Sequence, residues 1–142
     1  NALVIGIDKS SSRLSKHLPM PYQNYRLFQA TCEHVWAELV QAQVSCQKHY
    51  LLYPNPWPKK GHLKRRIHGH PSFPLLKALG GLIEVRSNWK IYVDEFAKAS
   101  KLLGLQAETT ALSVTDPLTL FERKYALDQQ SLWRCTAHAL DH

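Results

Sequence analysis

Tyr53-Pro54-Asn55-Pro56-Trp57-Pro58-Lys59-Lys60-Gly61-His62-Leu63-Lys64-Arg65-Arg66 is the stretch of this 142-residue chain that decides its fold. Its three prolines exclude a helix interior before His62, because proline lacks the amide donor and clashes with the preceding turn. The apolar run 50–53 before them predicts a strand that ends in a rigid loop. Prolines also restrict the unfolded chain, so holding Asn55 and Trp57 in fixed positions costs less entropy than in a glycine-rich loop. The stretch therefore predicts a site in which a few groups point one way.

The excess positive charge of the chain lies around this loop. The chain has 18 Lys and Arg against 11 Asp and Glu, a net charge of +7, and no acidic residue occurs between Glu38 and Glu84. The seven basic residues of that segment account for the whole excess: Lys48, Lys59, Lys60, Lys64, Arg65, Arg66 and Lys77. A basic patch beside a rigid aromatic loop suits a polyanion, because neutralising phosphates releases counterions. A solvated surface is the alternative, but the acid-free segment and the adjoining loop favour binding.

Length and composition indicate one globular domain over residues 1–142. A hydrophobic content of 44% is typical of soluble domains, and the chain is long enough to bury a substantial core. The longest aliphatic run, 2–7, is far too short to span a bilayer, and nothing argues for export, so we expect a cytoplasmic protein. The cysteines Cys32, Cys46 and Cys135 are odd in number and widely spaced, which predicts reduced thiols, mostly in the core.

Strand and helix patterns alternate along the chain, which predicts the α/β fold class. We expect strands at 2–7, 25–30, 49–53 and 82–87, a tail segment at 107–112 and a final strand near 132–137. We expect helices at 11–18, 32–42, 72–79 and 89–103, the first one ended by Pro19-Met20-Pro21. Thr31 and Asn88 are expected to cap helices, and Gly80-Gly81 to end one. The apolar run 2–7 is typical of a central parallel strand covered on both faces.

Asp8 lies at the carboxyl end of the first expected strand. In doubly wound folds, a carboxylate at this position can accept both hydroxyls of a nucleotide ribose. Asp8 could equally begin a turn or cap the helix 11–18, and the residues alone do not separate these two interpretations.

Four motifs of the chain resemble those of the tRNA (guanine-N7)-methyltransferases. The stretch 54–66 resembles the family's Pro-Asp-Pro-Trp, one residue, Lys, then His, two residues, Arg-Arg. Gly6-Ile7-Asp8 resembles its second-strand end, and Gly80-Gly81 followed by Ser87-Asn88-Trp89 and Tyr92 resembles its Gly-Gly and Thr-Asp-Trp segment. Thr119-Leu120-Phe121-Glu122 resembles its Thr-x-Phe-Glu. The motifs occur in the family's order over about 120 residues, which argues against coincidence.

This resemblance implies a Rossmann-like class I methyltransferase sheet with helices on both faces. It implies S-adenosyl-L-methionine as the cofactor and tRNA or another structured RNA as the partner, and it leaves the oligomeric state open. We expect no association with a membrane and no bound metal ion. His62, His68 and His70 lie in a basic segment without a carboxylate or cysteine near them in sequence, and neighbouring cations disfavour a divalent ion.

The resemblance also implies roles for individual residues. Asp8 would hold the ribose, and Thr31 stands where the family has an Asp for the adenine amino group. Asn55 occupies the catalytic position of the proline loop and would also bind the cofactor. The residues expected to contact RNA are Lys59, His62, Arg65, Arg66, Asn88, Thr119, Phe121 and Glu122. For Thr31 a helix cap is the alternative. For Glu122 it is an exposed acid paired with Arg123 or Lys124, and for Trp57 it is packing beneath the loop in place of stacking on a base.

Two differences from the family pattern concern charge: Asn55 and Asn88 stand where the family has Asp. Guanine N7 is a lone pair without a proton, so its methylation needs alignment and tolerance of positive charge in place of a general base. An amide can hydrogen-bond but loses a charge effect on the order of 2 to 4 kcal/mol. The alternatives are a different acceptor, such as an exocyclic amine, or a silent relative that acts as an RNA-binding module. General DNA binding is a third, without a motif to support it.

No part of the sequence resembles the glycine-rich loop that follows the first strand in methyltransferases of this type. The chain begins at what looks like the family's second strand. The family's first strand lies between its second and fourth, so its absence would expose two strand edges and the floor of the cofactor site. We therefore expect these residues to be part of a longer natural chain, and to bind cofactor poorly by themselves.

Overall fold

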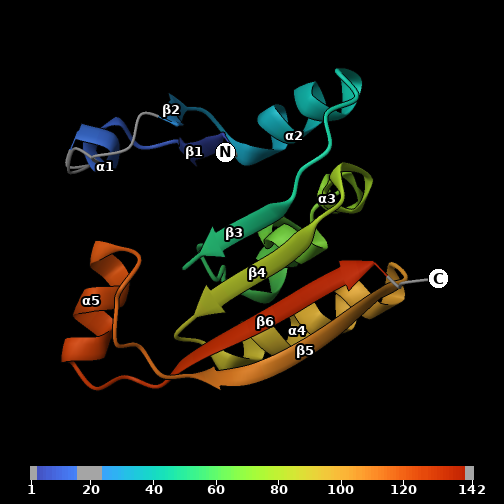
Figure 1. Ribbon diagram of the computed structural model, residues 1–142. Coiled ribbons are helices and arrows are strands. Elements are labelled where there is room, and N and C mark those ends of the chain that lie inside the picture. The colour runs from blue at the N-terminus through green and yellow to red at the C-terminus, as the bar shows by residue number, and fades with distance from the viewer. Residues whose placement is uncertain (1–2, 16–23, 140–142) are drawn as a thin grey trace.

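The computed structural model describes residues 3–15 and 24–139, which form an α/β fold (Figure 1). The strands are β1 (Val4–Asp8), β2 (Tyr25–Gln29), β3 (Lys48–Leu52), β4 (Leu82–Ser87), β5 (Leu105–Leu112) and β6 (Leu132–Ala139). The helices are α1 (Ser11–Ser15), α2 (Cys32–Gln41), α3 (Phe73–Leu79), α4 (Lys90–Leu102) and α5 (Leu120–Leu127), with 3-10 turns η1 (Lys60–Arg65) and η2 (Ile67–Gly69). Ala2, the end of the expected helix 11–18 and Pro19-Met20-Pro21 lie outside the described residues. Within them, no helix is long and apolar enough to cross a membrane.

The strands form two separate sheets. β1 pairs with β2 in parallel, and the second sheet has the order β3-β4-β6-β5, in which β3 and β4 are parallel and β6 is antiparallel to both its neighbours. Within residues 3–15 and 24–139, β1 pairs only with β2 and β3 only with β4, so the expected pair of free strand edges is present. β1, β3 and β4 run in the same direction, toward the side of the molecule where α5 stands (Figure 1).

The prediction that 2–7 forms a strand covered on both faces is wrong for its described part. Val4 and Ile5 of β1 are 55% and 39% exposed, and Leu27 and Phe28 of β2 are also exposed. The physical reason is that β1 has one paired edge, and the described residues place no complete layer over its side chains.

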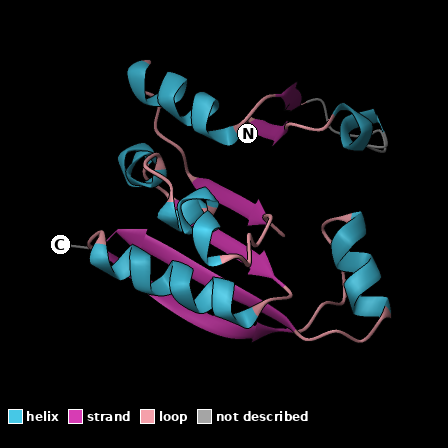
Figure 2. Ribbon diagram, turned by 180° about the vertical axis from the view of Figure 1, so that it is seen from behind, coloured by secondary structure: helices cyan, strands magenta, loops and turns pink. Residues whose placement is uncertain are grey.

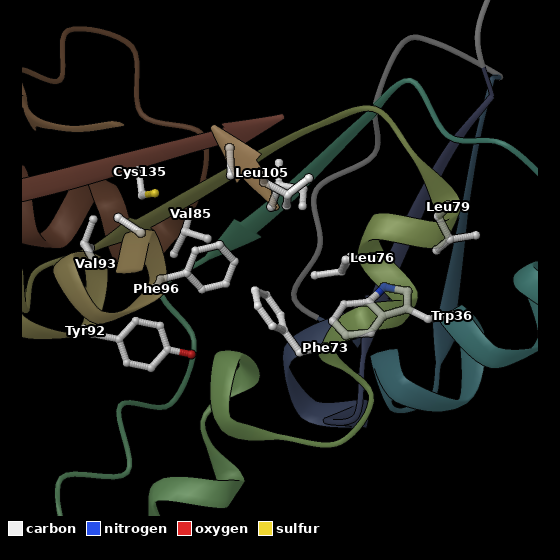
Figure 3. Packing of buried hydrophobic residues seen from close by; sticks show 13 residues of the cluster. Trp36, Phe73, Leu76, Leu79, Val85, Tyr92, Val93, Phe96, Leu105 and Cys135 are labelled. Atoms are coloured by element: carbon white, nitrogen blue, oxygen red, sulfur yellow. The ribbon is translucent and has the colours of Figure 1, made fainter. Parts of the chain in front are cut away.

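The hydrophobic core lies where α4 packs along one face of the four-stranded sheet (Figure 2). Tyr92 and Phe96, four residues apart on α4, are fully buried against Ile83 and Val85 of β4. Such a spacing places side chains on one face of a helix. The rest of the core comes from α2, α3, α4, β5 and β6: Trp36, Phe73, Leu76, Leu79, Val93, Ala97, Leu105, Cys135 and Ala137 (Figure 3).

One glycine decides how α3 joins β4. Gly81 has a φ of +84°, and a Cβ at this position would lie 2.6 Å from the carbonyl oxygen of Cys46. Only glycine fits such a left-handed residue pressed against another backbone. The turn brings the start of β4 beside β3, where Leu82 N donates to Gln47 O at 3.1 Å.

Replacing Phe96 by Ala should lower the free energy of unfolding by about 3–5 kcal/mol, because it removes a fully buried ring and leaves a cavity. Urea denaturation of the natural protein measures this. Ile91→Ala, on the exposed side of the same helix, is the matched control and should change stability by no more than about 0.5 kcal/mol. Equal losses in the two variants would contradict the packing described.

Candidate functional site

The proline loop follows β3, and two of its residues have a strained backbone. Tyr53 and Trp57 have φ angles of 51° and 46°, a left-handed conformation that costs a residue with a side chain on the order of 1–3 kcal/mol. Hydrogen bonds to their own backbone atoms hold both residues in place. Tyr53 N donates to Arg86 O at 2.8 Å, Trp57 N donates to Asn55 Oδ1 at 3.1 Å, and Trp57 O accepts from Arg66 Nε at 3.1 Å. The expected rigid loop is therefore present, and hydrogen bonds as well as prolines hold it.

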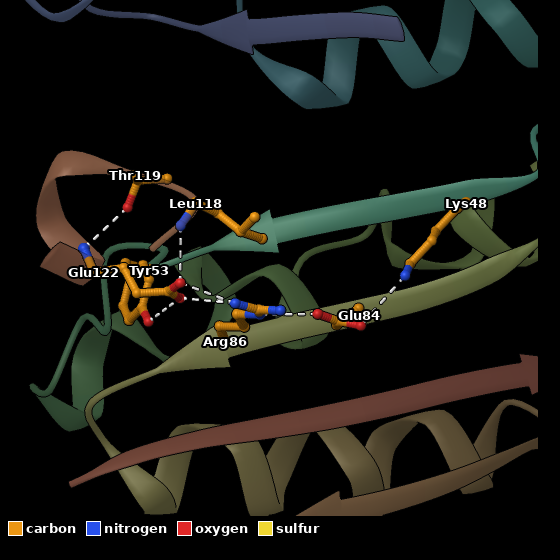
Figure 4. A network of polar contacts seen from close by, with 7 residues as sticks. All are labelled: Lys48, Tyr53, Glu84, Arg86, Leu118, Thr119 and Glu122. Atoms are coloured by element: carbon orange, nitrogen blue, oxygen red, sulfur yellow. Dashed lines mark hydrogen bonds and ion pairs between the residues drawn. The ribbon is translucent and has the colours of Figure 1, made fainter. Parts of the chain in front are cut away.

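A buried carboxylate lies beside the first residue of this loop (Figure 4). The side chain of Glu122 is 0% exposed. Its Oε1 accepts from Arg86 Nη1 at 2.9 Å and Leu118 N at 3.0 Å, and its Oε2 accepts from Tyr53 Oη at 2.5 Å and Arg86 Nη1 at 3.1 Å. The expected alternative for Glu122, an exposed acid paired with Arg123 or Lys124, is therefore wrong. The expectation that Glu122 contacts RNA is also corrected, because both of its oxygens are engaged inside the protein.

The ion pairs continue along β4. Arg86 Nε donates to Glu84 Oε2 at 2.8 Å, and Lys48 Nζ lies 3.5 Å from Glu84 Oε1. Burial alone raises the pKa of Glu122, but the hydrogen bonds from Tyr53, Leu118 and Arg86 outweigh it and hold the pKa below its ordinary value. Burial first, and then the Glu122 carboxylate, raise the pKa of Tyr53. Glu122 is therefore ionised and Tyr53 is a neutral donor at neutral pH.

This network joins three of the segments that the sequence singled out. Tyr53 is the first residue of the proline loop, Arg86 precedes Ser87-Asn88-Trp89, and Glu122 belongs to the Thr119–Glu122 segment. Thr119 caps α5, since its hydroxyl accepts from Glu122 N at 3.0 Å. Sequence reasoning gave Tyr53 and Arg86 no role. A signal was present, because Glu84 and Arg86 alternate with apolar residues and so share one face of the strand.

Four exposed cations lie beside the loop, and we call Lys59, Lys60, Lys64 and Arg65 the basic apron. Within the described parts of the chain, none of them forms an ion pair with an acid. The Arg65 guanidinium lies 5.1 Å from the centre of the Trp57 ring, and the His62 ring meets the same indole edge-on at 5.4 Å. Trp57 is half-buried among these side chains.

Three other basic residues of the acid-free segment have partners within the protein, and one of them is buried. Arg66 is 4% exposed, and besides Trp57 O its guanidinium binds Glu95 and lies over the Trp89 ring. The expectation that Arg66 contacts RNA is therefore corrected: its side chain points inward and holds the loop. Lys48 pairs with Glu84, and Lys77 Nζ donates to Leu103 O at 2.8 Å.

Asp8 is the last residue of β1, and Thr31 lies just after the end of the parallel strand β2. Ala30 N donates to Asp8 O at 3.1 Å, so the two strand ends lie next to each other. The Asp8 carboxylate accepts from Arg13 Nε and Nη2, each at 2.8 Å, and from Ser10 N at 2.9 Å. The bond from Arg13 holds the pKa of Asp8 below its ordinary value. Thr31 is the N-cap residue of α2, but its hydroxyl contacts His34 Nδ1 at 3.0 Å and makes no capping bond.

The remaining candidates lie at the same end of the sheet or beneath it. Asn88 does not cap α4, since Trp89 is the N-cap residue, and Asn88 Nδ2 instead donates to Gln130 Oε1 at 3.2 Å. Phe121 is 48% exposed, and its ring stacks on Tyr125.

His68 packs edge-on against Tyr92 and contacts Glu95 at 3.1 Å, a carboxylate that is distant in sequence. In the described ranges, no three His, Cys, Asp or Glu residues are grouped as a metal site would need.

Comparison with known proteins identifies the family. A family described as "Putative methyltransferase" matches residues 2–135. The chain belongs to this methyltransferase family. Its curated relatives include tRNA (guanine-N(7)-)-methyltransferases from several bacteria. That of Aquifex aeolicus is 32% identical over 89 residues, which are 60% of this chain and 30% of the relative.

Two further relatives with the same name also match the chain over part of their length. That of Azorhizobium caulinodans is 40% identical over 77 residues, 52% of this chain and 33% of the relative. That of Chlorobium phaeobacteroides is 29% identical over 135 residues, 87% of this chain and 63% of the relative. The family member described here thus spans about a third of the length of the first two relatives.

Solved structures support the fold of this family member. The antibiotic-resistance methyltransferase Kmr superposes with a TM-score of 0.53 at 17% identity, covering 97% of this chain and 76% of that one. The precorrin 8w decarboxylase of Methanobacterium thermoautotrophicum superposes with a TM-score of 0.55 at 13% identity, covering 97% and 70%. The predicted class I methyltransferase fold is therefore confirmed.

Arg65 and Arg66 should behave differently on replacement in this methyltransferase family member. Arg66→Ala removes a buried guanidinium and the bond to Trp57 O, and should lower the free energy of unfolding by about 2 kcal/mol or more. Arg65→Ala is the matched control, because it removes an exposed side chain and should change stability by no more than about 0.5 kcal/mol. Chemical denaturation measures both, and a neutral Arg66→Ala would show that this side chain does not hold the loop.

Proposed function

We propose that the protein transfers a methyl group from S-adenosylmethionine to N7 of a guanine in tRNA, and that it does so in the cytoplasm. The observation that carries this proposal is the proline loop, which holds Asn55 beside the four cations of the basic apron at the end of the parallel strand β3. Curated relatives that match this chain are named tRNA (guanine-N(7)-)-methyltransferases, which supports the substrate.

Asp8 at the end of β1 and Thr31 just after β2 are the proposed cofactor-binding residues of the two-stranded sheet. When bound, S-adenosylmethionine supplies a methyl group made electrophilic by a positively charged sulfur. A carboxylate has roughly four lone-pair sites, and Arg13 and Ser10 occupy three of those of Asp8. The remaining site can accept one ribose hydroxyl, and accepting both requires one bond from Arg13 to break. The Asp8 carboxylate thus fits the sugar in chemical type, as an acceptor for its hydroxyl groups.

Asn55 is the proposed group at the reacting centre. Guanine N7 carries no proton at neutral pH, so the residues of the site have to align the acceptor and need not remove a proton. Asn55 is exposed, and its Oδ1 fixes Trp57 N, which leaves the amide NH₂ available to hydrogen-bond the cofactor amine or a base. A neutral amide aligns the base but gives no charge stabilisation to the methylated, cationic purine.

The basic apron is the proposed contact with tRNA phosphates. Lys59 follows the loop directly, Arg65 ends the 3-10 turn η1 after it, and His62 lies beside the indole of Trp57. Arginine offers a planar fork of donors that matches a phosphate, and the cations need no rearrangement because no acid neutralises them within the described residues. Phe121 and Asn88, at the same end of the sheet, are the proposed neighbours of the target base.

An RNA-binding relative with weak or absent catalysis is the second candidate. It is favoured by Asn55 and Asn88, which are neutral where a carboxylate would support methylation. Calorimetric titration of the longest natural chain with S-adenosylmethionine, followed by a methylation assay on unmodified tRNA, separates the two. Cofactor binding with N7 methylation supports the first candidate. RNA binding without cofactor binding supports the second.

Asn55→Asp should raise the rate of guanine N7 methylation by about tenfold or more, because a carboxylate stabilises the positive charge that develops on the purine. The loop should be unchanged, since a carboxylate oxygen can also accept from Trp57 N. The measurement is turnover of the natural protein on unmodified tRNA at saturating cofactor.

Gln106→Glu, at an exposed position of β5, controls for the added negative charge and should leave turnover unchanged. Equal turnover by the Asn55→Asp variant and the wild-type protein would remove the charge argument. Methylation of a nucleotide atom other than N7 would indicate a different acceptor.

Lys59→Ala, Lys64→Ala and Arg65→Ala should each weaken tRNA binding and lower the slope of log K against log salt by about 0.7–0.9, because each removes one phosphate contact. Titration of labelled tRNA at several salt concentrations measures the slope. Lys98→Ala, an exposed lysine of α4, is the matched control. A slope that all three apron variants share with the wild type would contradict the proposed role of the apron.

A further inference from the structure

We infer, on the basis of the proposed function, that Tyr53 and Arg86 are positioning residues for the target base. They act through the buried carboxylate of Glu122, which fixes the proline loop against α5 (Figure 4). The distance between these two segments decides where a base can lie. Neither Tyr53 nor Arg86 needs to touch RNA or cofactor for this role.

Glu122 cannot bind a base directly while this arrangement holds. Its side chain is 0% exposed, and each of its two oxygens already accepts two hydrogen bonds. A carboxylate has roughly four lone-pair sites, so all of them are engaged. The carboxylate therefore acts as a link between protein segments and not as a ligand for the base.

The link fixes groups on both sides of the proposed base site. On the loop side, Tyr53 is in the strained left-handed conformation and lies two residues before Asn55. On the helix side, the Tyr53 ring lies 5.4 Å from the ring of Tyr125, which in turn stacks on the half-exposed Phe121. A shift of the Tyr53 hydroxyl from Glu122 therefore changes the position of Asn55 relative to Phe121.

Arg86 gives this link its charge and its connection to β4. Its backbone oxygen accepts from Tyr53 N at 2.8 Å, while its guanidinium bonds both Glu122 and Glu84. One residue thus holds the start of the loop by its main chain and the start of α5 by its side chain. Asn88, which follows β4, donates from Nδ2 to Oε1 of Gln130 at 3.2 Å, and so ties this segment to the one that follows α5.

The test compares Tyr53→Phe and Arg86→Met in the natural protein by steady-state methylation of tRNA. Tyr53→Phe removes one donor, and Arg86→Met leaves the carboxylate without its cation. Because a misplacement of about 1 Å can cost 10²-fold in rate, we expect kcat to fall about fivefold in the first variant and about thirtyfold in the second. KM for tRNA should stay within about twofold, because the basic apron is intact.

Two further variants separate positioning from general damage. The double variant should lose little more than Arg86→Met, because both residues act through the same carboxylate. Arg86→Lys keeps a cation and should recover part of the lost kcat. Tyr50→Phe, which removes a hydroxyl from an exposed tyrosine of β3, is the matched control and should leave kcat unchanged.

Unchanged kcat in Tyr53→Phe, or a raised KM with normal kcat, would overturn the inference. Should Arg86→Met fail to fold, Tyr53→Phe alone decides the matter. Hydrogen exchange gives a readout without catalysis: the amide of Leu118, which donates to Glu122, should exchange faster in Tyr53→Phe, while the amides of α4 are unaffected. If the wild type does not methylate tRNA, the proposed function fails. In that case, an unchanged exchange rate of the Leu118 amide in Tyr53→Phe would by itself refute the link through Glu122.

Discussion

The structure of the site depends on one buried ionised carboxylate, that of Glu122. Taking a carboxylate out of water costs several kcal/mol unless charge and hydrogen bonds compensate. Here the compensation comes from Arg86 on β4, Tyr53 at the start of the proline loop and Leu118 before α5. Because the donors belong to three segments, none of these segments can take its final position without the others. The arrangement of the site therefore depends on all three segments together and not on any one motif.

Much of the fold could be predicted from the sequence, because its apolar periodicities and prolines act locally. The strands and the helices α2, α3 and α4 lie close to their expected positions. The helix α5 was missed, since Leu120 and Leu127 are exposed and its single buried side chain is the acid Glu122. A helix that buries a charge has no apolar stripe to reveal it.

The site could be predicted only in its exposed half. The proline loop and the cations after it are local features, and they lie together as expected. Arg65 and Arg66 are indistinguishable in sequence, yet one is exposed and the other turns inward to Glu95, 29 positions later. The partners of Glu122 are 36 and 69 positions distant. Pairings over such separations follow from the tertiary structure, which no local pattern encodes.

The two sheets divide the proposed chemistry between them. Asp8 ends β1 and Thr31 follows β2, whereas Asn55 follows β3, so methyl donor and acceptor would be held by different sheets. In-line transfer needs reacting atoms held to a fraction of an ångström, so the sheets have to be fixed relative to each other. Within the described residues, α2 provides this connection: its Trp36 is buried in the same core as Phe73 and Leu76 of α3 (Figure 3). The packing of one indole, remote from the loop, is therefore as much a condition for alignment as the groups that would touch the substrate.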